Sequence, residues 1–120
     1  MGFLSEVGAI FGFGPKPEAI EREALKGELD AGTVALVDVR EAGEFESGHV
    51  PGAVNVPLTR FSIDLLPNDG RTVVLMCRSG ARARMAFVRA MAAGRPGLKV
   101  YNGSMLDWSA AGEDIVRGNG

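Results

Sequence analysis

The sequence of 120 residues predicts an α/β fold with a single domain, in which a central parallel sheet of four or five strands carries helices on both faces. Apolar, β-branched runs alternate along the chain with segments of helical periodicity. These runs are almost continuously apolar, which is typical of strands covered on both faces. The length suits one domain with a core of its own.

Residues 1–17 are predicted to form an apolar N-terminal arm and a linker. The arm carries Glu6 as its one charge, and Pro15 and Pro17 mark the linker. Its apolar side chains have helical spacing, which favours packing against the domain or a homodimer contact. We expect no membrane contact, because the arm has no Lys or Arg and is too short to span a bilayer. Without a basic region typical of a secretory signal, a cytoplasmic location is expected.

The main domain is predicted at residues 18–117, and residues 118–120 form a short tail. The first helix, Glu23–Ala31, has Leu25 and Leu29 at apolar positions and Gly32 as its stop. Strands are expected at 34–39, 53–56, 72–76 and, more weakly, 98–101, and further helices at 42–47, 59–66, 81–93 and 105–111.

The only cysteine, Cys77, stands where the strand 72–76 gives way to a polar loop, and a helix follows from Ala81. Parallel α/β sheets bind their ligands outside the carboxyl ends of the strands, which is where Cys77 stands. The helix N-terminus and the guanidinium groups of Arg78 and Arg82 would stabilise a thiolate. A lone cysteine is often a small core residue, but this setting favours a nucleophile that holds an anionic adduct. We therefore expect Cys77 to face the loop and not the core.

Two segments carry motifs of a known family. The first runs from Leu36-Val37-Asp38-Val39-Arg40-Glu41 through Glu44-Phe45 to Gly48-His49-Val50-Pro51-Gly52-Ala53-Val54-Asn55-Val56-Pro57. The second is Cys77-Arg78-Ser79-Gly80-Ala81-Arg82, a cysteine followed by four residues and an arginine. Together with Trp108 and Gly112, they resemble the rhodanese homology domain, a family of single-domain thiosulfate sulfurtransferases, over roughly residues 19–116.

The resemblance implies a sulfurtransferase. Cys77 would take a sulfane sulfur from thiosulfate or another persulfide donor and pass it to a thiophilic acceptor, which could be cyanide, a thiol or a protein. The backbone amides of Arg78, Ser79, Gly80, Ala81 and Arg82 would cradle the added sulfur. The side chain of Arg82 would orient the loop and hold the oxyanion of the donor, while Arg78 guides anions inward. Neither a cofactor nor a metal is implied.

Four residues of the first segment are candidates for a supporting role. The resemblance implies that Asp38 and Arg40 brace loops through hydrogen bonds, and that Glu44 acts similarly. His49 is the only histidine, and without a partner at ligand spacing it makes no metal site, so it is expected to shape its turn.

One segment departs from the family pattern. Asn102-Gly103-Ser104 stands where the family often has paired glycines. Asparagine tolerates a left-handed backbone, so we expect the turn to be kept through Asn102.

A net charge of −2 argues against nucleic-acid binding, because it provides no basic surface for the phosphates. Two other functions remain as alternatives. Related phosphatases and arsenate reductases place five residues between cysteine and arginine, whereas Cys77 and Arg82 enclose four and Ala83 stands where the longer pattern needs arginine. A sulfur-carrier or regulatory module that acts on a protein partner is the other alternative.

Overall fold

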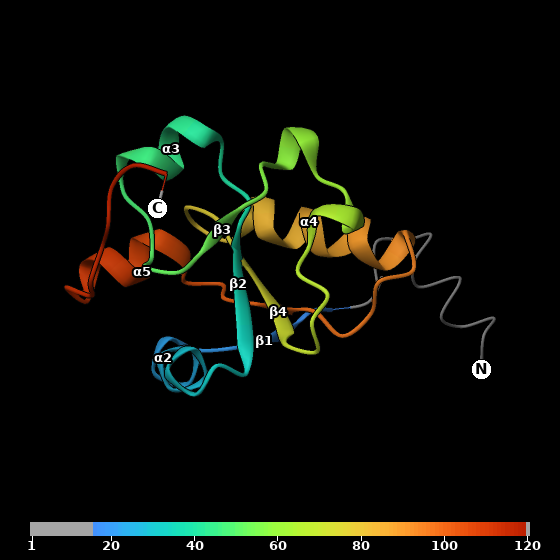
Figure 1. The fold of residues 1–120 in the computed structure, drawn as a ribbon, viewed down its shortest axis with the longest axis horizontal. Helices are drawn as coiled ribbons and strands as arrows, with labels where there is room; N and C mark the ends of the chain where they lie inside the picture. Colours follow the sequence, from blue (N-terminus) through green and yellow to red (C-terminus); the bar gives the residue numbers. More distant parts are fainter. Residues whose placement is uncertain (1–15, 120) are drawn as a thin grey trace.

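The computed structural model describes residues 16–119 (Figure 1). Its elements are, in order, β1 (Glu18–Ala19), α2 (Arg22–Ala31), β2 (Val34–Asp38), α3 (Ala42–Ser47), β3 (Val54–Asn55), the 3-10 helices η1 (Leu58–Arg60) and η2 (Ile63–Leu65), β4 (Thr72–Met76), α4 (Ala81–Ala92), β5 (Lys99–Val100) and α5 (Ser104–Ala110). The predicted N-terminal arm, with its possible homodimer contact, lies outside the described residues, as does Gly120. No helix between residues 16 and 119 is long and apolar enough to cross a membrane.

The strands form one parallel sheet, as the apolar runs predicted, and their order in the sheet is β1-β5-β4-β2-β3. β2 and β4 form its centre, with Val34 beside Thr72 at one end and Asp38 beside Met76 at the other. The chain leaves β2 toward β3 on one side and leaves β4 toward β5 on the other. The order of the strands therefore switches between β2 and β4, and a crevice at such a point is where open α/β sheets bind ligands.

Helices cover both faces of the sheet, as expected. On one face α4 packs with η1 and η2 against the strands, and the buried cluster there includes Val37, Leu75 and Phe87. On the other face α2 and α5 bury Leu25 and Trp108 with strand residues. Figure 1 shows α4 and α2 on opposite sides of the central strands.

Two local elements differ from the prediction. The expected helix over 59–66 is two short 3-10 helices, because Ser62 is extended and its hydroxyl accepts a hydrogen bond from the N–H of Asp64. The strand β1 was not predicted. It has two residues and joins the sheet edge, where the N–H of Ile20 extends the pairing to the carbonyl of Val100.

Candidate active site

Cys77 follows β4 directly and lies at the switch point of the sheet. Cys77 is only 1% exposed and belongs to the core cluster beneath α4, together with Ala83 and Phe87. The expectation that Cys77 faces the loop and not the core is therefore wrong in part. The loop folds back over the end of β4, so the sulfur is covered although it still contacts the loop: the N–H of Gly80 donates to Sγ at 3.0 Å.

Gly80 allows the loop to close over the sulfur. It precedes α4 and has a φ of 103°, which glycine adopts without strain. A Cβ added here would lie 2.7 Å from the carbonyl oxygen of Asn102, so the position has no room for a side chain. Within residues 16–119, the N–H groups of Ala81, Arg82 and Ala83 have no backbone acceptor. These donors lie in the first turn of α4, next to the covered thiol.

The turn before α5 holds the other side of the loop. The N–H of Cys77 donates to Oγ of Ser104 at 3.1 Å, and that hydroxyl donates to the carbonyl of Tyr101 at 2.8 Å. The N–H groups of Met105 and Leu106 donate to the carbonyls of Cys77 and Arg78, each at 3.0 Å. The loop is thus tied to α5 through its backbone.

Ser104 also corrects the prediction for this turn. It is fully buried and has a φ of 54°, and it is the only residue other than glycine with a positive φ in the described part of the chain. The left-handed residue is therefore Ser104 and not Asn102. The two hydrogen bonds of the buried hydroxyl offset the strain of that conformation, which costs about 1–2 kcal/mol for a residue with a Cβ.

Arg82 points toward α3 and pairs with Glu44. Its two terminal nitrogens donate to the two carboxylate oxygens at 2.6 and 2.9 Å. This pair and the N–H of Glu41 hold the pKa of Glu44 at about 2, below its ordinary value of 4.5. Glu44 also belongs to the capping box that begins α3. The guanidinium of Arg82 therefore ties α4 to α3.

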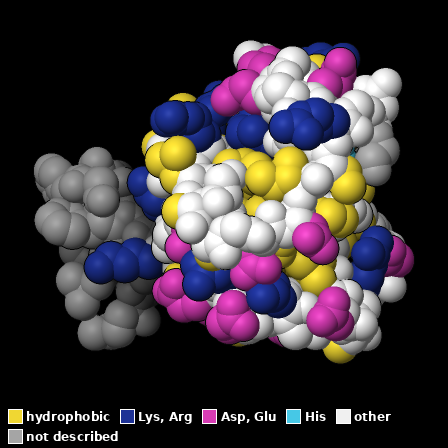
Figure 2. Space-filling model, turned by 90° about the vertical axis from the view of Figure 1, so that its left-hand side faces the viewer, with side chains coloured by type: hydrophobic (Ala, Val, Ile, Leu, Met, Phe, Trp, Pro, Cys, Tyr) yellow, Lys and Arg dark blue, Asp and Glu magenta, His cyan; other side chains and the backbone are white. Residues whose placement is uncertain are grey.

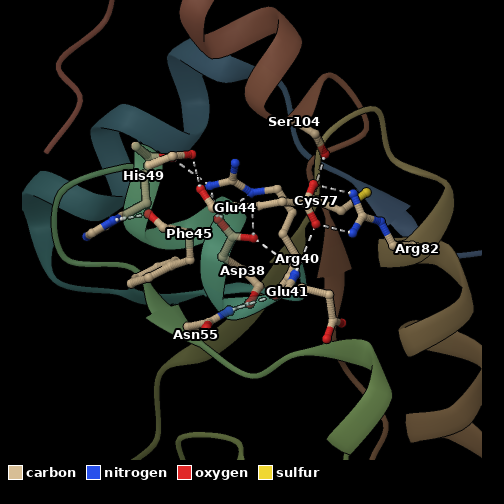
Figure 3. A network of polar contacts seen from close by, with 12 residues as sticks. Asp38, Arg40, Glu41, Glu44, Phe45, His49, Asn55, Cys77, Arg82 and Ser104 are labelled. Carbon is tan, nitrogen blue, oxygen red and sulfur yellow. Dashed lines mark hydrogen bonds and ion pairs between the residues drawn. The ribbon is translucent and has the colours of Figure 1, made fainter. Parts of the chain in front are cut away.

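Asp38 and Arg40 form a buried ion pair at the end of β2 (Figure 3). Both carboxylate oxygens of Asp38 accept hydrogen bonds from the guanidinium, which also donates to the carbonyl of Gly48 at 2.8 Å. The side-chain amide of Asn55 donates to the carbonyls of Asp38 and Arg40 at 3.0 and 2.9 Å. These contacts tie the loop after β2 to Gly48 at the end of α3 and to Asn55 in β3.

His49 is buried against α3. Its ring stacks on Phe45 with centroids 3.6 Å apart, and its Nδ1 lies 2.8 Å from the carbonyl of Phe45. Its backbone pairs with Val116 in an antiparallel bridge. No group of three His, Cys, Asp or Glu side chains that could hold a metal occurs within the described range.

The remaining predicted loop residues are exposed. They are Arg78, Ser79 and, at the start of α4, Ala81.

Asn55 and Ser104 were not identified as site residues from the sequence. The signal for Ser104 was its place in the segment that departs from the family pattern, but only the fold shows that its hydroxyl reaches the N–H of Cys77.

Comparison with known proteins identifies the family. The rhodanese-like domain family matches residues 21–111. A sulfurtransferase of Allochromatium vinosum is 35% identical, and the match covers 84% of this chain and 96% of that protein. This chain belongs to the rhodanese-like domain family. A human single-domain sulfurtransferase has the same fold, with a TM-score of 0.68 and 23% identity over 80% of this chain and 97% of that one.

Rhodanese-like domains also occur within longer relatives. An HTH-type transcriptional regulator of Mycobacterium tuberculosis is 40% identical over 88% of this chain, and the match covers 47% of the regulator. The chain thus spans about half the length of the first curated relatives it matches. The rhodanese fold is shared by proteins whose names describe different roles, so the activity of this chain has to be argued from its own site.

Proposed function

We propose that this rhodanese-like chain is a sulfurtransferase that moves a sulfane sulfur from thiosulfate or another persulfide donor to a thiophilic acceptor, through a persulfide on Cys77. The observation that carries the proposal is the contact between Sγ of Cys77 and the N–H of Gly80, at 3.0 Å in a loop whose next amides have no backbone acceptor within residues 16–119. An added anionic sulfur would meet these donors.

The first step loads the cysteine. The thiolate of Cys77 attacks the outer sulfur of thiosulfate, the S–S bond of the donor breaks, and its electron pair leaves on sulfite. A proton taken from solvent gives the neutral persulfide. In the second step the acceptor attacks the outer sulfur, the bond between the two sulfurs breaks, and the electron pair returns to Sγ as the thiolate. The proton of the persulfide leaves with the transferred sulfur and passes to solvent when the product is thiocyanate. No external oxidant or reductant is needed.

The other residues would position the loop or attract the donor. Ser104 holds the backbone of Cys77, and Gly80 gives the loop its closed shape. Since the guanidinium of Arg82 is bonded to Glu44, we assign Arg82 a positioning role. Arg78 is exposed, so we propose that its guanidinium attracts the donor anion. Asp38, Arg40 and His49 would support the surrounding loops. We place the reaction in the cytoplasm, with a small molecule or a protein as acceptor.

The loop length favours this reaction over phosphoryl transfer. Four residues separate Cys77 from Arg82, and one loop amide already lies 3.0 Å from Sγ. Such a closed loop suits one added sulfur atom better than a tetrahedral phosphate group. If the protein hydrolyses an aryl phosphate and this hydrolysis requires Cys77, the proposed activity would have to be that of a phosphatase and not of a sulfurtransferase.

The test is the variant Cys77→Ser. Serine is nearly isosteric but is a poor nucleophile toward sulfur, so the variant should fold and form no thiocyanate from thiosulfate and cyanide. Far-ultraviolet circular dichroism and a melting curve show whether the fold is kept. Thiocyanate formation at the rate of the unsubstituted protein would exclude Cys77 as the nucleophile. Slow turnover with small acceptors but rapid transfer to a protein acceptor would favour the carrier role.

A further inference from the structure

The two carboxylate oxygens of Asp107, in α5, bind partners from two other parts of the fold. One oxygen accepts a hydrogen bond from the hydroxyl of Tyr101 at 2.5 Å, and the other accepts one from the guanidinium of Arg22 at 2.8 Å. Tyr101 directly follows β5 and is 1% exposed, whereas Arg22 is the first residue of α2. Asp107 therefore joins the end of β5 to α2.

Both partners favour the ionised form of Asp107. The hydrogen bonds from Tyr101 and Arg22 hold the pKa of Asp107 below its ordinary value of 3.8. Burial, together with the hydrogen bond to Asp107, raises the pKa of Tyr101 above its ordinary value of 10.0. At neutral pH a neutral phenol thus donates to a carboxylate. Charge-assisted hydrogen bonds of this kind are roughly twice as strong as neutral ones.

The side chain of Asp107 also covers the turn that precedes α5. Its Cβ lies 2.6 Å from the position that a Cβ at Gly103 would take, so the backbone of the turn passes directly beneath it. The N–H of Asp107 donates to the carbonyl of Gly103 at 3.1 Å. Asp107 therefore holds the turn 101–104 at two points, the side chain of Tyr101 and the backbone beside Ser104.

This turn sets the position of the cysteine loop. Ser104 has a φ of 54°, and a residue keeps such a conformation only where its surroundings hold it there. If Ser104 relaxed toward a right-handed φ, its hydroxyl would move away from the N–H of Cys77. The N–H groups of Met105 and Leu106, which hold the loop carbonyls, follow in the same segment. A change in the turn that Asp107 covers would thus displace the loop.

A second acidic residue shares Arg22 but not the turn. The carboxylate of Glu113 accepts a hydrogen bond from Lys26 at 2.9 Å and lies 3.4 Å from Nε of Arg22. Figure 2 shows the side of the molecule that carries α5, where Lys and Arg side chains lie beside Asp and Glu side chains in the lower part of the face. Of these two carboxylates, that of Asp107 is the one bonded to the turn.

We propose that Asp107 is a positioning residue for sulfur transfer, because its carboxylate and the hydroxyl of Tyr101 hold the turn 101–104 so that Ser104 fixes the backbone of Cys77. The proposal rests on the proposed function and adds to it a residue outside the cysteine loop. Asp107 acts through the turn and not on the reacting sulfur itself. The loop amides are then in place before the donor arrives.

The test measures how fast a saturating donor loads Cys77. Protein is mixed with thiosulfate, or with glutathione persulfide if thiosulfate does not load it, quenched in acid and analysed by intact mass spectrometry. The rate constant reports the loop geometry in the molecules that react, and the final loaded fraction reports how many molecules are active. Urea denaturation gives the stability of each variant, and loading is measured where every variant is folded.

We expect Asp107→Ala and Tyr101→Phe each to lower the rate constant by about two- to tenfold, as for the loss of one hydrogen bond. The donor concentration that gives half the maximal rate should not change, because neither side chain binds the donor. Asp107→Asn keeps one acceptor oxygen and should retain part of the rate. Adding Asp107→Ala to Ser104→Ala should slow loading little further, since both act through the same turn.

The matched control is Glu113→Ala, which removes the same kind of group beside Arg22 and should load at the unsubstituted rate. A spectroscopic measurement separates the variants independently of activity. In a proton–nitrogen correlation spectrum, a weaker hydrogen bond to Ser104 should move the amide proton of Cys77 upfield in Tyr101→Phe but not in Glu113→Ala.

Each result has a distinct meaning. Unchanged rate constants in Asp107→Ala and Tyr101→Phe, with a loss of stability alone, would assign Asp107 only the bracing of α2 and overturn the proposal while leaving the sulfurtransferase intact. Losses that multiply when Asp107→Ala is added to Ser104→Ala would also overturn it. If Asp107→Ala does not fold, Tyr101→Phe decides. Failure of both donors to load Cys77 in the unsubstituted protein would overturn this proposal together with the proposed function.

Discussion

The N–H of Cys77 donates a hydrogen bond to the hydroxyl of Ser104 at 3.1 Å, and Ser104 has a left-handed φ of 54° where it accepts that bond. A residue in a strained conformation beside a candidate nucleophile indicates that the contact matters for the site. The hydroxyl fixes where the backbone of Cys77 lies, and therefore where its sulfur meets the loop amides.

Ser104→Ala should lower the free energy of unfolding by about 1–3 kcal/mol, because it leaves the buried N–H of Cys77 without an acceptor. Ser104→Gly loses the same bond but relieves the left-handed strain, so it should be less destabilising than the alanine variant. Both should lower kcat/KM for thiosulfate. Chemical denaturation and steady-state kinetics measure the two effects, and an alanine variant as stable and active as the unsubstituted protein would assign Ser104 no role in the site.

Gly80→Ala should destabilise the protein by more than the roughly 1–2 kcal/mol that a left-handed φ costs. The added Cβ would lie 2.7 Å from the carbonyl oxygen of Asn102, in backbone that cannot easily move away. Gly32→Ala is the matched control, since Gly32 has a φ of 73° but nothing within 4 Å of an added Cβ. Denaturation curves of both variants give the comparison. Equal losses would show that the contact with Asn102 is easily relieved.

Arg82→Ala should lower kcat/KM for thiosulfate more than Arg78→Ala does, because it releases α4 from α3. The side chains of Arg82 and Glu44 are 32% and 35% exposed, so we expect an effect near the lower end for a charged hydrogen bond, about tenfold. If Arg82 acts through Glu44, the double variant with Glu44→Ala should be little worse than Arg82→Ala alone. If the losses in kcat/KM of the two single variants multiply in the double variant, Arg82 would instead contact the donor directly.

The pair of Glu44 and Arg82 also gives a pH dependence. Folding lowers the pKa of Glu44 from 4.5 to about 2, so its contribution to stability is fully present above pH 4.5 and is lost as the pH falls toward 2. The stability difference between the unsubstituted protein and Glu44→Gln should therefore be constant near neutrality and shrink over that acid range. Urea denaturation at several pH values measures it. A difference that does not change below pH 4.5 would exclude an ionised pair with Arg82.

Most of the fold could be predicted from local patterns. The apolar run at Thr72–Met76 and the Gly32 stop were placed correctly, because burial on both faces and a left-handed helix end leave direct marks in the sequence. The strand β1 could not be predicted, since two residues at a sheet edge carry no periodicity. The prediction of one helix over 59–66 was wrong because the side chain of Ser62 competes with the helix for backbone N–H groups.

The site could be predicted in composition but not in geometry. The spacing of Cys77 and Arg82 indicated the loop, and its resemblance to a family pattern is the basis of the proposed chemistry. The burial of the thiol, the pairing of Arg82 with Glu44 and the reach of Ser104 depend on segments that are far apart in the sequence. Such contacts follow from the packing of α3, α4 and α5 against the sheet, which no local pattern encodes.

The most direct test of the central claim is intact mass spectrometry of the protein after incubation with thiosulfate. A persulfide on Cys77 predicts a species heavier by one sulfur atom, which cyanide or a reductant removes and which Cys77→Ser does not form. Absence of this species with thiosulfate and with other persulfide donors, while Cys77 stays reduced and the protein stays folded, would contradict the proposed sulfurtransferase.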